Sequence, residues 1–241
     1  MSASVPFPRK QRSDGEQARA HLLACALRLF ADKGFAKTST RDIAEAAQVN
    51  ISSISYYFGD KAGLYRAVFI DPRSNPDIDP RLFDDPDAPL PDVLKSFLGA
   101  MVEPLKMGDL MQCCAKLHFR EMLEPTGVWL EEIDHVIKPA HAGLVRLLCR
   151  HLGLTEGEAD DDIHRLAFSI TGLAVNLMVS GDPMKALRPS LLSSPQAIDI
   201  YIDRMAQFAM AMLEVERERR ALQAASTPAP ILLTSQKLFL P

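Results

Sequence analysis

Residues 39–61 read STRDIAEAAQVNISSISYYFGDK. Ser39 is followed three residues later by Asp42, and this capping-box spacing predicts the start of a helix. That helix is short, because Gln48-Val49-Asn50 breaks it, and Asn50 is able to cap a second helix over residues 51–58. Two short helices joined by a tight turn, with small alanines on the inner side of the first, are typical of a helix-turn-helix.

The second of these helices has a polar outer surface that suits DNA. Ile54 and Phe58 are four residues apart, so both should face inward. The residues that then face outward are Ser52, Ser53, Ser55 and Tyr56. Hydroxyl groups and an aromatic ring, with no acidic residue, suit base edges and phosphates. The alternative is a generic three-helix bundle whose serines are merely solvated.

A phosphate site is expected where the next helix begins. Asp60 is able to cap that helix, which places Lys61 at its N-terminus. Backbone amide groups and a cation together favour a phosphate at such a position.

The distribution of charge supports a small basic module on an acidic body. The 241 residues have a net charge of −4, which argues against a protein that coats nucleic acid over its whole surface. Residues 1–66, however, hold ten Lys or Arg and six Asp or Glu, whereas the remainder holds 17 and 25. The 47% of hydrophobic residues and 24% of charged residues are typical of a soluble globular chain.

The rest of the chain predicts an all-α protein with a linker after the basic module. Residues 71–91 contain six prolines and six aspartates, so we expect a linker that buries little surface. Helices are expected at about 90–106, 109–123, 127–152, 156–180 and 195–224, because no segment alternates with a period of two. The expected organisation is a flexible basic N-terminus at 1–14, a helix-turn-helix domain at 15–70, the linker at 71–91, a helical ligand-binding and dimerisation domain at 92–225 and a tail at 226–241.

Several other classes of protein are disfavoured. The longest apolar run, residues 166–181, is interrupted by polar residues and is shorter than the roughly 20 residues of a membrane span. Four sparse cysteines predict reduced thiols in a cytoplasmic protein. The adjacent Cys113 and Cys114 lack the spacing of a zinc site, and the histidines are scattered. No catalytic motif is present, so we expect neither an enzyme nor a metal or other cofactor.

One face of the expected helix 109–123 is a candidate ligand site. Its soft and apolar residues recur every three or four positions, and Glu121 lies three residues after His118. An imidazole and a carboxylate on an apolar stripe could line a pocket for a partly apolar organic molecule. The candidate contacts are Met111, Cys114, His118, Glu121, Met122, Trp129 and Phe168. Plain core packing with a hydrogen-bonded histidine is the alternative.

The last two long helices carry apolar stripes that are candidates for a dimer interface. Two such helices from each of two chains would form a four-helix interface. The candidate interface residues are Ile170, Leu173, Leu177, Tyr201, Met205, Phe208 and Met212. The alternative is that these stripes form the internal core of a monomer.

A family resemblance adds to these predictions. Residues 40–47, 49–50, 56–61 and 64–65, within a match over about residues 16–69, resemble the DNA-binding domain of TetR-family transcriptional regulators. The resemblance implies an all-helical homodimer whose three N-terminal helices bind DNA and whose divergent C-terminal domain holds the ligand and the dimer interface. Residues 120–126 and 134–139 resemble a TetR subgroup whose C-terminal domain is tied to drug-sensitivity regulators.

The resemblance and the helix pattern together assign the DNA contacts. Thr40 and Arg41 correspond to backbone and base contacts, and Tyr57 and Lys61 correspond to a phosphate clamp. The full set of candidate DNA-binding residues is Ser39, Thr40, Arg41, Asn50, Ser52, Ser53, Ser55, Tyr56, Tyr57 and Lys61. Ile51 and Ser55 depart from the family pattern, in which a polar or basic residue and a larger aromatic are common.

These observations predict a ligand-responsive transcriptional regulator. We expect a homodimeric repressor that binds a palindromic double-stranded DNA operator, is released by a small organic inducer and has no contact with a membrane. The alternative is a helical small-molecule carrier or enzyme with a vestigial DNA-binding module.

Overall fold

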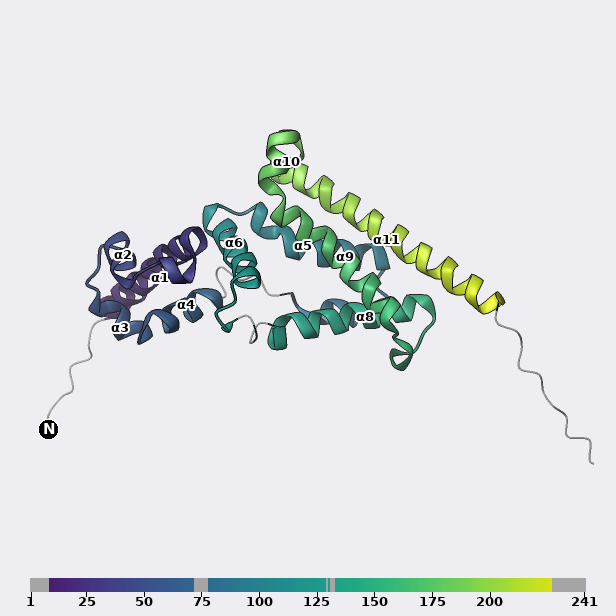
Figure 1. Cartoon of the computed structure of the whole chain (residues 1–241), viewed down its shortest axis with the longest axis horizontal. Coiled ribbons are helices and arrows are strands. Elements are labelled where there is room, and N and C mark those ends of the chain that lie inside the picture. Colours follow the sequence, from purple (N-terminus) through teal and green to yellow (C-terminus); the bar gives the residue numbers. More distant parts are fainter. Residues whose placement is uncertain (1–8, 72–77, 129, 131–132, 227–241) are drawn as a thin grey trace, which may run out of the picture.

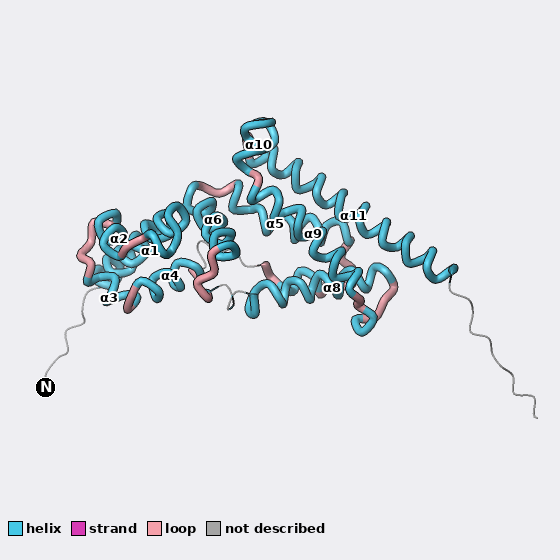
Figure 2. The backbone as a smooth tube through the Cα atoms, viewed as in Figure 1, coloured by secondary structure: helices cyan, strands magenta, loops and turns pink. Residues whose placement is uncertain are grey.

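The computed structural model describes residues 9–71, 78–128, 130 and 133–226, and every regular element among them is a helix (Figure 2). The expected all-α fold is confirmed. Helices α1 to α4 gather at one end of the molecule, and the long helix α11 runs along the other end (Figure 1).

The N-terminal end consists of α1 (Arg9–Lys37), α2 (Thr40–Ala46), α3 (Ser52–Phe58) and α4 (Lys61–Phe69). Gly34 interrupts α1 with a φ of +80°, a conformation that glycine adopts without a steric penalty. These helices share one hydrophobic core, whose largest fully buried side chains include Leu22, Leu27, Phe30, Ile43, Ile54, Leu64 and Phe69.

The second end is built around a separate core. Its helices are α5 (Leu90–Val102), α8 (Lys138–Leu152), α9 (Asp161–Val179), α10 (Gly181–Leu187) and α11 (Pro195–Ser226), whereas the buried residues of α6 (Asp109–Leu123) include members of the N-terminal core. Short 3-10 helices cover Pro80–Phe83, Glu103–Leu105, Glu156–Glu158 and Pro189–Leu192, and a π-helical turn covers Ile133–Ile137. The core includes Leu94, Leu98, Leu144, Leu148, Ile163, Ile170 and Leu177.

One of the expected helices is interrupted and another begins later than the apolar pattern suggested. The helix expected at 127–152 is α-helical at Val128 and Leu130, and a π-helical turn at Ile133–Ile137 then precedes α8, which begins at Lys138. The helix expected at 156–180 starts at Asp161, where the side chain of Asp160 accepts hydrogen bonds from the amides of Asp162 and Ile163. Local capping therefore decides where α9 begins.

The Pro/Asp-rich segment buries more than was expected. Phe83 is fully buried in the second core, where its ring packs edge-on against Phe97 at 5.4 Å between centroids. Gly143 provides the space, since a Cβ atom there would lie 2.4 Å from the Phe83 ring. The expectation that this segment buries little is wrong at Phe83, because an aromatic side chain in a proline-rich loop is able to reach a neighbouring core.

Helix α6 connects the two ends of the molecule. Leu117 and Cys114 of α6 belong to the N-terminal core, and Lys116 forms a 2.8 Å ion pair with Asp32 of α1. The Arg120 guanidinium donates to the carbonyl oxygens of Ala31 and Asp32 near the end of α1. A movement of α6 therefore bears directly on the N-terminal helices.

Among the described residues, no single helix is both long and apolar enough to cross a membrane. Taken together, α9 and α10 have the length and the apolar composition of a membrane span, but the chain bends by 67° between them.

Candidate nucleic-acid interface and ligand cavity

The predicted capping box sets the start of α2. The amide of Asp42 donates to Ser39 Oγ at 3.1 Å, and the amide of Ser39 donates to Asp42 Oδ2 at 3.3 Å. Hydrogen bonds from the Ser39 side chain and backbone lower the pKa of the Asp42 carboxyl. Both candidate contacts that follow, Thr40 and the exposed Arg41, are thereby held in the first turn of α2.

Asn50 caps α3 through its side chain. Its Oδ1 atom accepts from the amide of Ser52 at 2.9 Å and from the Ser52 hydroxyl at 2.8 Å. These bonds satisfy one amide at the helix start and orient the Ser52 side chain. Asn50, which is itself exposed, thus positions the start of α3.

The outer face of α3 carries the polar residues that the pattern placed there. Tyr56 is 82% exposed, Ser52 and Ser55 are exposed, and Ser53 is half-buried. Ile54 is buried, as expected. A shallow groove of about 370 Å³ runs beside this face, lined by Thr40, Ile51, Ser52, Ile54, Ser55, Gly59, Asp60 and Lys61.

Ile51 is a DNA-facing candidate that the sequence argument treated only as a departure from the family pattern. Its side chain is 50% exposed at the start of α3 and lines the groove next to Ser52 and Ser55. An apolar side chain at this place is suited to contact with the methyl group of thymine.

The two residues predicted to form a phosphate clamp lie at the junction of α3 and α4, with Tyr57 near the end of α3 and Lys61 at the start of α4. Asp60 caps α4 by accepting from the amide of Gly63 at 2.7 Å. The ammonium group of Lys61 lies 4.3 Å from the centroid of the Phe35 ring, which holds the cation in place while leaving it partly exposed. Tyr57 is half-buried and packs edge-on against Tyr56, with 4.9 Å between centroids.

A large cavity lies between α5, α6 and α9. Its volume is about 460 Å³, within the range of small-molecule sites. The described residues that line it are Ile78, Ala100, Met101, Pro104, Cys114, Ala115, His118, Phe119, Met122, Val136, Ile137, Phe168, Thr171, Gly172, Val175 and Met178. None of these is Asp, Glu, Lys or Arg, so the described wall is uncharged.

Four of the seven predicted ligand contacts line this cavity: Cys114, His118, Met122 and Phe168. Met111 is buried but is absent from the described wall, because it lies one turn before the part of α6 that borders the space. Trp129 lies outside the described residues.

Glu121 does not line the cavity, and its expected pairing with a ligand beside His118 is corrected by the structure. The Glu121 side chain is fully buried against α4, where Oε2 accepts from the Tyr65 hydroxyl at 2.7 Å. Its Oε1 atom accepts from the amide and the hydroxyl of Thr126 at 2.7 and 2.9 Å. Burial and the hydrogen bond to Glu121 raise the pKa of Tyr65. This carboxylate joins α4 to α6.

His118 lies between the cavity and the N-terminal helices. Its ring lines the cavity and stacks on the Phe69 ring of α4, with 4.2 Å between centroids. His118 Nδ1 lies 2.9 Å from the carbonyl oxygen of Cys114. The His118 side chain therefore borders the cavity and also packs against α4.

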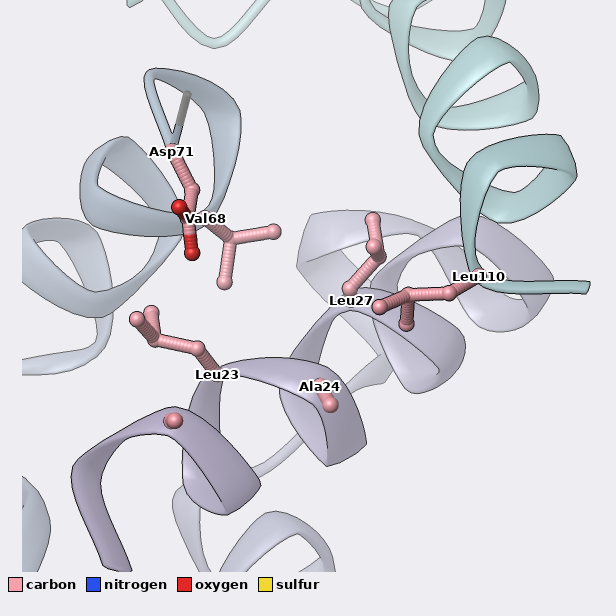
Figure 3. A pocket seen from close by; sticks show the side chains of 7 residues that line it. Leu23, Ala24, Leu27, Val68, Asp71 and Leu110 are labelled. Carbon is pink, nitrogen blue, oxygen red and sulfur yellow. The ribbon is translucent and has the colours of Figure 1, made fainter. Parts of the chain in front are cut away.

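A second pocket, of only about 80 Å³, lies between α1, α4 and the start of α6 (Figure 3). Leu23, Leu27, Val68 and Leu110 point into it, with Asp71 at the end of α4. This space is large enough for a few atoms only, and it marks the junction at which the N-terminal helices meet α6.

Comparison with known proteins assigns both halves of the chain. Residues 22–68 match the model of bacterial regulatory proteins of the tetR family, and residues 90–214 match the C-terminal domain of the HTH-type transcriptional dual regulator CecR. The CecR protein of Shigella flexneri is 34% identical over 161 residues, which are 62% of this chain and 71% of CecR. The chain belongs to the TetR family of transcriptional regulators.

Further matches agree with this membership. The HTH-type transcriptional regulator AcrR of Shigella flexneri is 38% identical over 61 residues, which are 25% of this chain and 28% of AcrR. A putative transcriptional regulator from Pseudomonas aeruginosa PAO1 shares the fold, with a TM-score of 0.59 and 21% identity over 88% of this chain and 97% of that one. This TetR-family protein is thus a DNA-binding transcriptional regulator.

TetR-family regulators usually act as dimers, and the structure sorts the predicted interface residues of this one into two groups. Ile170, Leu177 and Met205 are buried in the core of the same chain, so they are not available to a partner. Leu173, Tyr201 and Met212 are half-buried, and Phe208 is 45% exposed. Each apolar stripe therefore contains both core and surface residues, because the chain's own helices cover only part of the stripe.

The exposed part of the α11 stripe extends further along the helix than expected. Val215 and Leu222 are exposed and follow Phe208 at intervals of seven residues, which places all three on one side of α11. The interface residues predicted on this helix of the TetR-family protein end at Met212, so neither Val215 nor Leu222 is among them.

Proposed function

We propose that this TetR-family protein is a repressor that binds a near-palindromic operator as a homodimer and is released by an uncharged, mostly apolar molecule. The observation that carries the proposal is the position of His118, whose ring borders the cavity and stacks on Phe69 of α4.

The DNA-binding surface consists of the exposed residues of α2 and α3, together with Lys61. Two copies of α3 related by a two-fold axis reach successive major grooves when they lie about 34–36 Å apart. A two-fold dimer then reads two half-sites of inverted sequence, so we infer a near-palindrome. The exposed residues of α9 and α11, with Phe208 at their centre, are the proposed dimer contacts.

The proposed inducer is uncharged because of the chemistry of the wall. An ion that leaves water for a cavity without a charged partner loses several kcal/mol or more of solvation free energy. The polar groups of the described wall are those of His118, Thr171 and Cys114. A molecule with one or two hydrogen-bonding groups on an apolar body therefore fits best.

Coupling between the two sites runs through α6. A ligand that fills the cavity presses on the His118 ring, and displacement of that ring moves Phe69 near the end of α4. The other end of α4 carries Lys61 and borders the DNA-binding surface. The resulting loss of DNA affinity is limited by the difference in ligand affinity between the two conformations.

The most informative experiment is a gel shift with the full chain and the DNA that flanks its own gene, measured at several salt concentrations. We expect binding that weakens steeply with salt and a protected site of near-palindromic sequence. Absence of salt-sensitive binding to this DNA, and to any sequence from a selected library, would overturn the repressor proposal and favour a carrier with a vestigial DNA-binding module.

The inducer part is tested separately with Gly172→Leu. Gly172 lines the cavity and a Cβ atom there meets nothing within 4 Å, so we expect a leucine at this position to occupy part of the cavity. We expect this variant to bind operator DNA normally and to resist every inducer of the wild-type protein. If it responds as the wild type does, the cavity is not the inducer site.

A further inference from the structure

A thiol and an imidazole lie together in the wall of the cavity. Cys114 Sγ is 3.6 Å from His118 Nδ1, and both residues line the space. Cys25, Cys113 and Cys149 are absent from the described wall. Cys114 is buried and belongs to the N-terminal core, against which the half-buried Cys113 packs, and Cys149 is buried in the second core, so it is the cavity wall alone that sets Cys114 apart. Cys114 is therefore the one cysteine among the described lining residues of the cavity.

The position of the His118 ring favours a negative charge on the sulfur of Cys114. His118 Nδ1 lies 2.9 Å from the carbonyl oxygen of Cys114, and a carbonyl only accepts, so Nδ1 carries a hydrogen in this contact. The same N–H group lies within reach of Cys114 Sγ. A nitrogen donor beside the sulfur stabilises a thiolate, which is the reactive form of cysteine.

The wall selects the kind of molecule that reaches this sulfur. With no charged residue among its described lining, the cavity disfavours anionic oxidants and charged thiol reagents. It favours neutral, mostly apolar compounds of a size that fits about 460 Å³. Among these, compounds with an electron-poor carbon react with a soft thiolate.

We propose that Cys114 covalently captures neutral apolar enones, that is, α,β-unsaturated ketones. Sγ attacks the β-carbon and forms a C–S bond while the electron pair of the C=C bond moves toward the carbonyl group. The thiol proton ends on the α-carbon, so nothing is oxidised or reduced and no group leaves. The effect of the adduct on DNA binding rests on the proposed function, whereas the capture itself does not.

The capture is tested with the full reduced protein and 2-cyclohexen-1-one, followed by intact-mass measurement and peptide mapping. We expect one adduct, on Cys114, that forms at least about tenfold faster than any adduct on the other cysteines. Cys113→Ser is the matched control, because it changes the neighbouring thiol outside the cavity and should keep the adduct. A faster reaction at Cys113, or equal reaction at all four cysteines, would overturn the proposal.

Two further variants, which both keep the Cys114 thiol, test whether the cavity and the imidazole control its reaction. Gly172→Leu adds a side chain to the cavity wall and is expected to slow the reaction of Cys114 about tenfold, while the reaction of Cys113 with a sulfonated maleimide stays unchanged. His118→Phe keeps a ring against Phe69 but removes the N–H donor, and it should also slow the reaction. If Cys114 reacts equally fast in both variants, neither the cavity nor the imidazole controls it and the proposal fails.

The two proposals fail in distinguishable ways. Labelling of Cys114 without a change in operator affinity supports capture and counts against coupling between the cavity and DNA. Release of DNA by cyclohexanone, which has the same ring but no reactive double bond, with Cys114 left unlabelled by the enone, supports the repressor and overturns capture.

Discussion

The hydroxyl of Tyr65 on α4 donates a 2.7 Å hydrogen bond to Glu121 on α6, and both side chains are buried. This contact joins the last helix of the N-terminal domain to the helix that borders the cavity. The two residues are 56 positions apart in the chain, so the bond is a tertiary contact. It helps to hold α4 on α6.

Tyr65→Phe should destabilise the protein by about 1–3 kcal/mol, because it leaves a buried carboxylate oxygen without its donor. Urea unfolding monitored by circular dichroism would show a lower midpoint at an unchanged slope. Tyr56→Phe is the control, since that hydroxyl is exposed, and its effect should stay within about 0.5 kcal/mol. Equal midpoints for Tyr65→Phe and the wild type would contradict the role given to this bond.

The ion pairs of Glu216 predict a loss of stability in acid. Hydrogen bonds from Arg219, followed by those from Arg220, lower the pKa of Glu216 below its ordinary value of 4.5. A carboxyl whose pKa is lower in the folded state stabilises the fold above the unfolded pKa, and this contribution is lost as the pH falls through the folded pKa.

Glu216→Gln should therefore be less stable than the wild type at pH 7, and the difference should shrink as the pH falls below 4.5. Urea midpoints at pH 7 and at lower pH measure this. Glu218→Gln, on the exposed side of the same helix, should show no such convergence. A constant gap at all pH values would mean that the ion pairs of Glu216 do not produce the effect.

Lys61→Ala and Tyr57→Phe should weaken binding to all DNA sequences about equally, because both side chains are assigned to phosphates. For Lys61→Ala, the slope of log affinity against log salt should become shallower by about 1. Filter binding on specific and random DNA provides the measurement. Lys185→Ala removes an exposed lysine of α10 and should leave the slope unchanged. An unaltered slope for Lys61→Ala would remove this residue from the phosphate clamp.

Substitutions on the outer face of α3 should have a different effect. Ser53→Ala and Tyr56→Ala are expected to change the preference between sequences, because base contacts carry the specificity. Selection of bound sequences from a random library tests this. If the selected sequences of both variants match those of the wild type, these side chains do not read bases.

Gly63→Ala should destabilise the DNA-binding end of the molecule. A Cβ atom at Gly63 would lie 2.1 Å from the carbonyl oxygen of Phe58, so the junction between α3 and α4 would have to open. Overpacking of this kind costs about 1–3 kcal/mol, and operator affinity should fall with it. Gly181→Ala, where a Cβ meets nothing within 4 Å, is the control. Thermal unfolding that is the same for both variants would contradict the predicted clash.

Much of the local structure followed from patterns that act over a few residues. The Ser39–Asp42 capping box forms as predicted, and the helix expected at 109–123 is α6 with those bounds. Ile54 is buried and Tyr56 is exposed, because a helical period of 3.6 residues places them on different faces. Such features depend on contacts between neighbours in the chain, so the sequence alone is sufficient to predict them.

Tertiary packing decided which of the predicted faces meets which neighbour. Periodicity placed His118 and Glu121 side by side, yet the structure turns His118 toward the cavity and gives Glu121 to Tyr65. Likewise, Ile170 and Phe208 both belong to apolar stripes, but Ile170 is covered by its own chain and Phe208 is not.

The physical reason is that an amphipathic pattern reports which side chains share a face of a helix and gives no information on the partner of that face. A capping box has its donor and acceptor three residues apart, so the sequence alone determined the start of α2. Tyr65, which donates to Glu121, and Gly143, which leaves the space for Phe83, both come from distant helices. Only the tertiary structure, in which those helices are brought together, decided that these two residues belong to the interior.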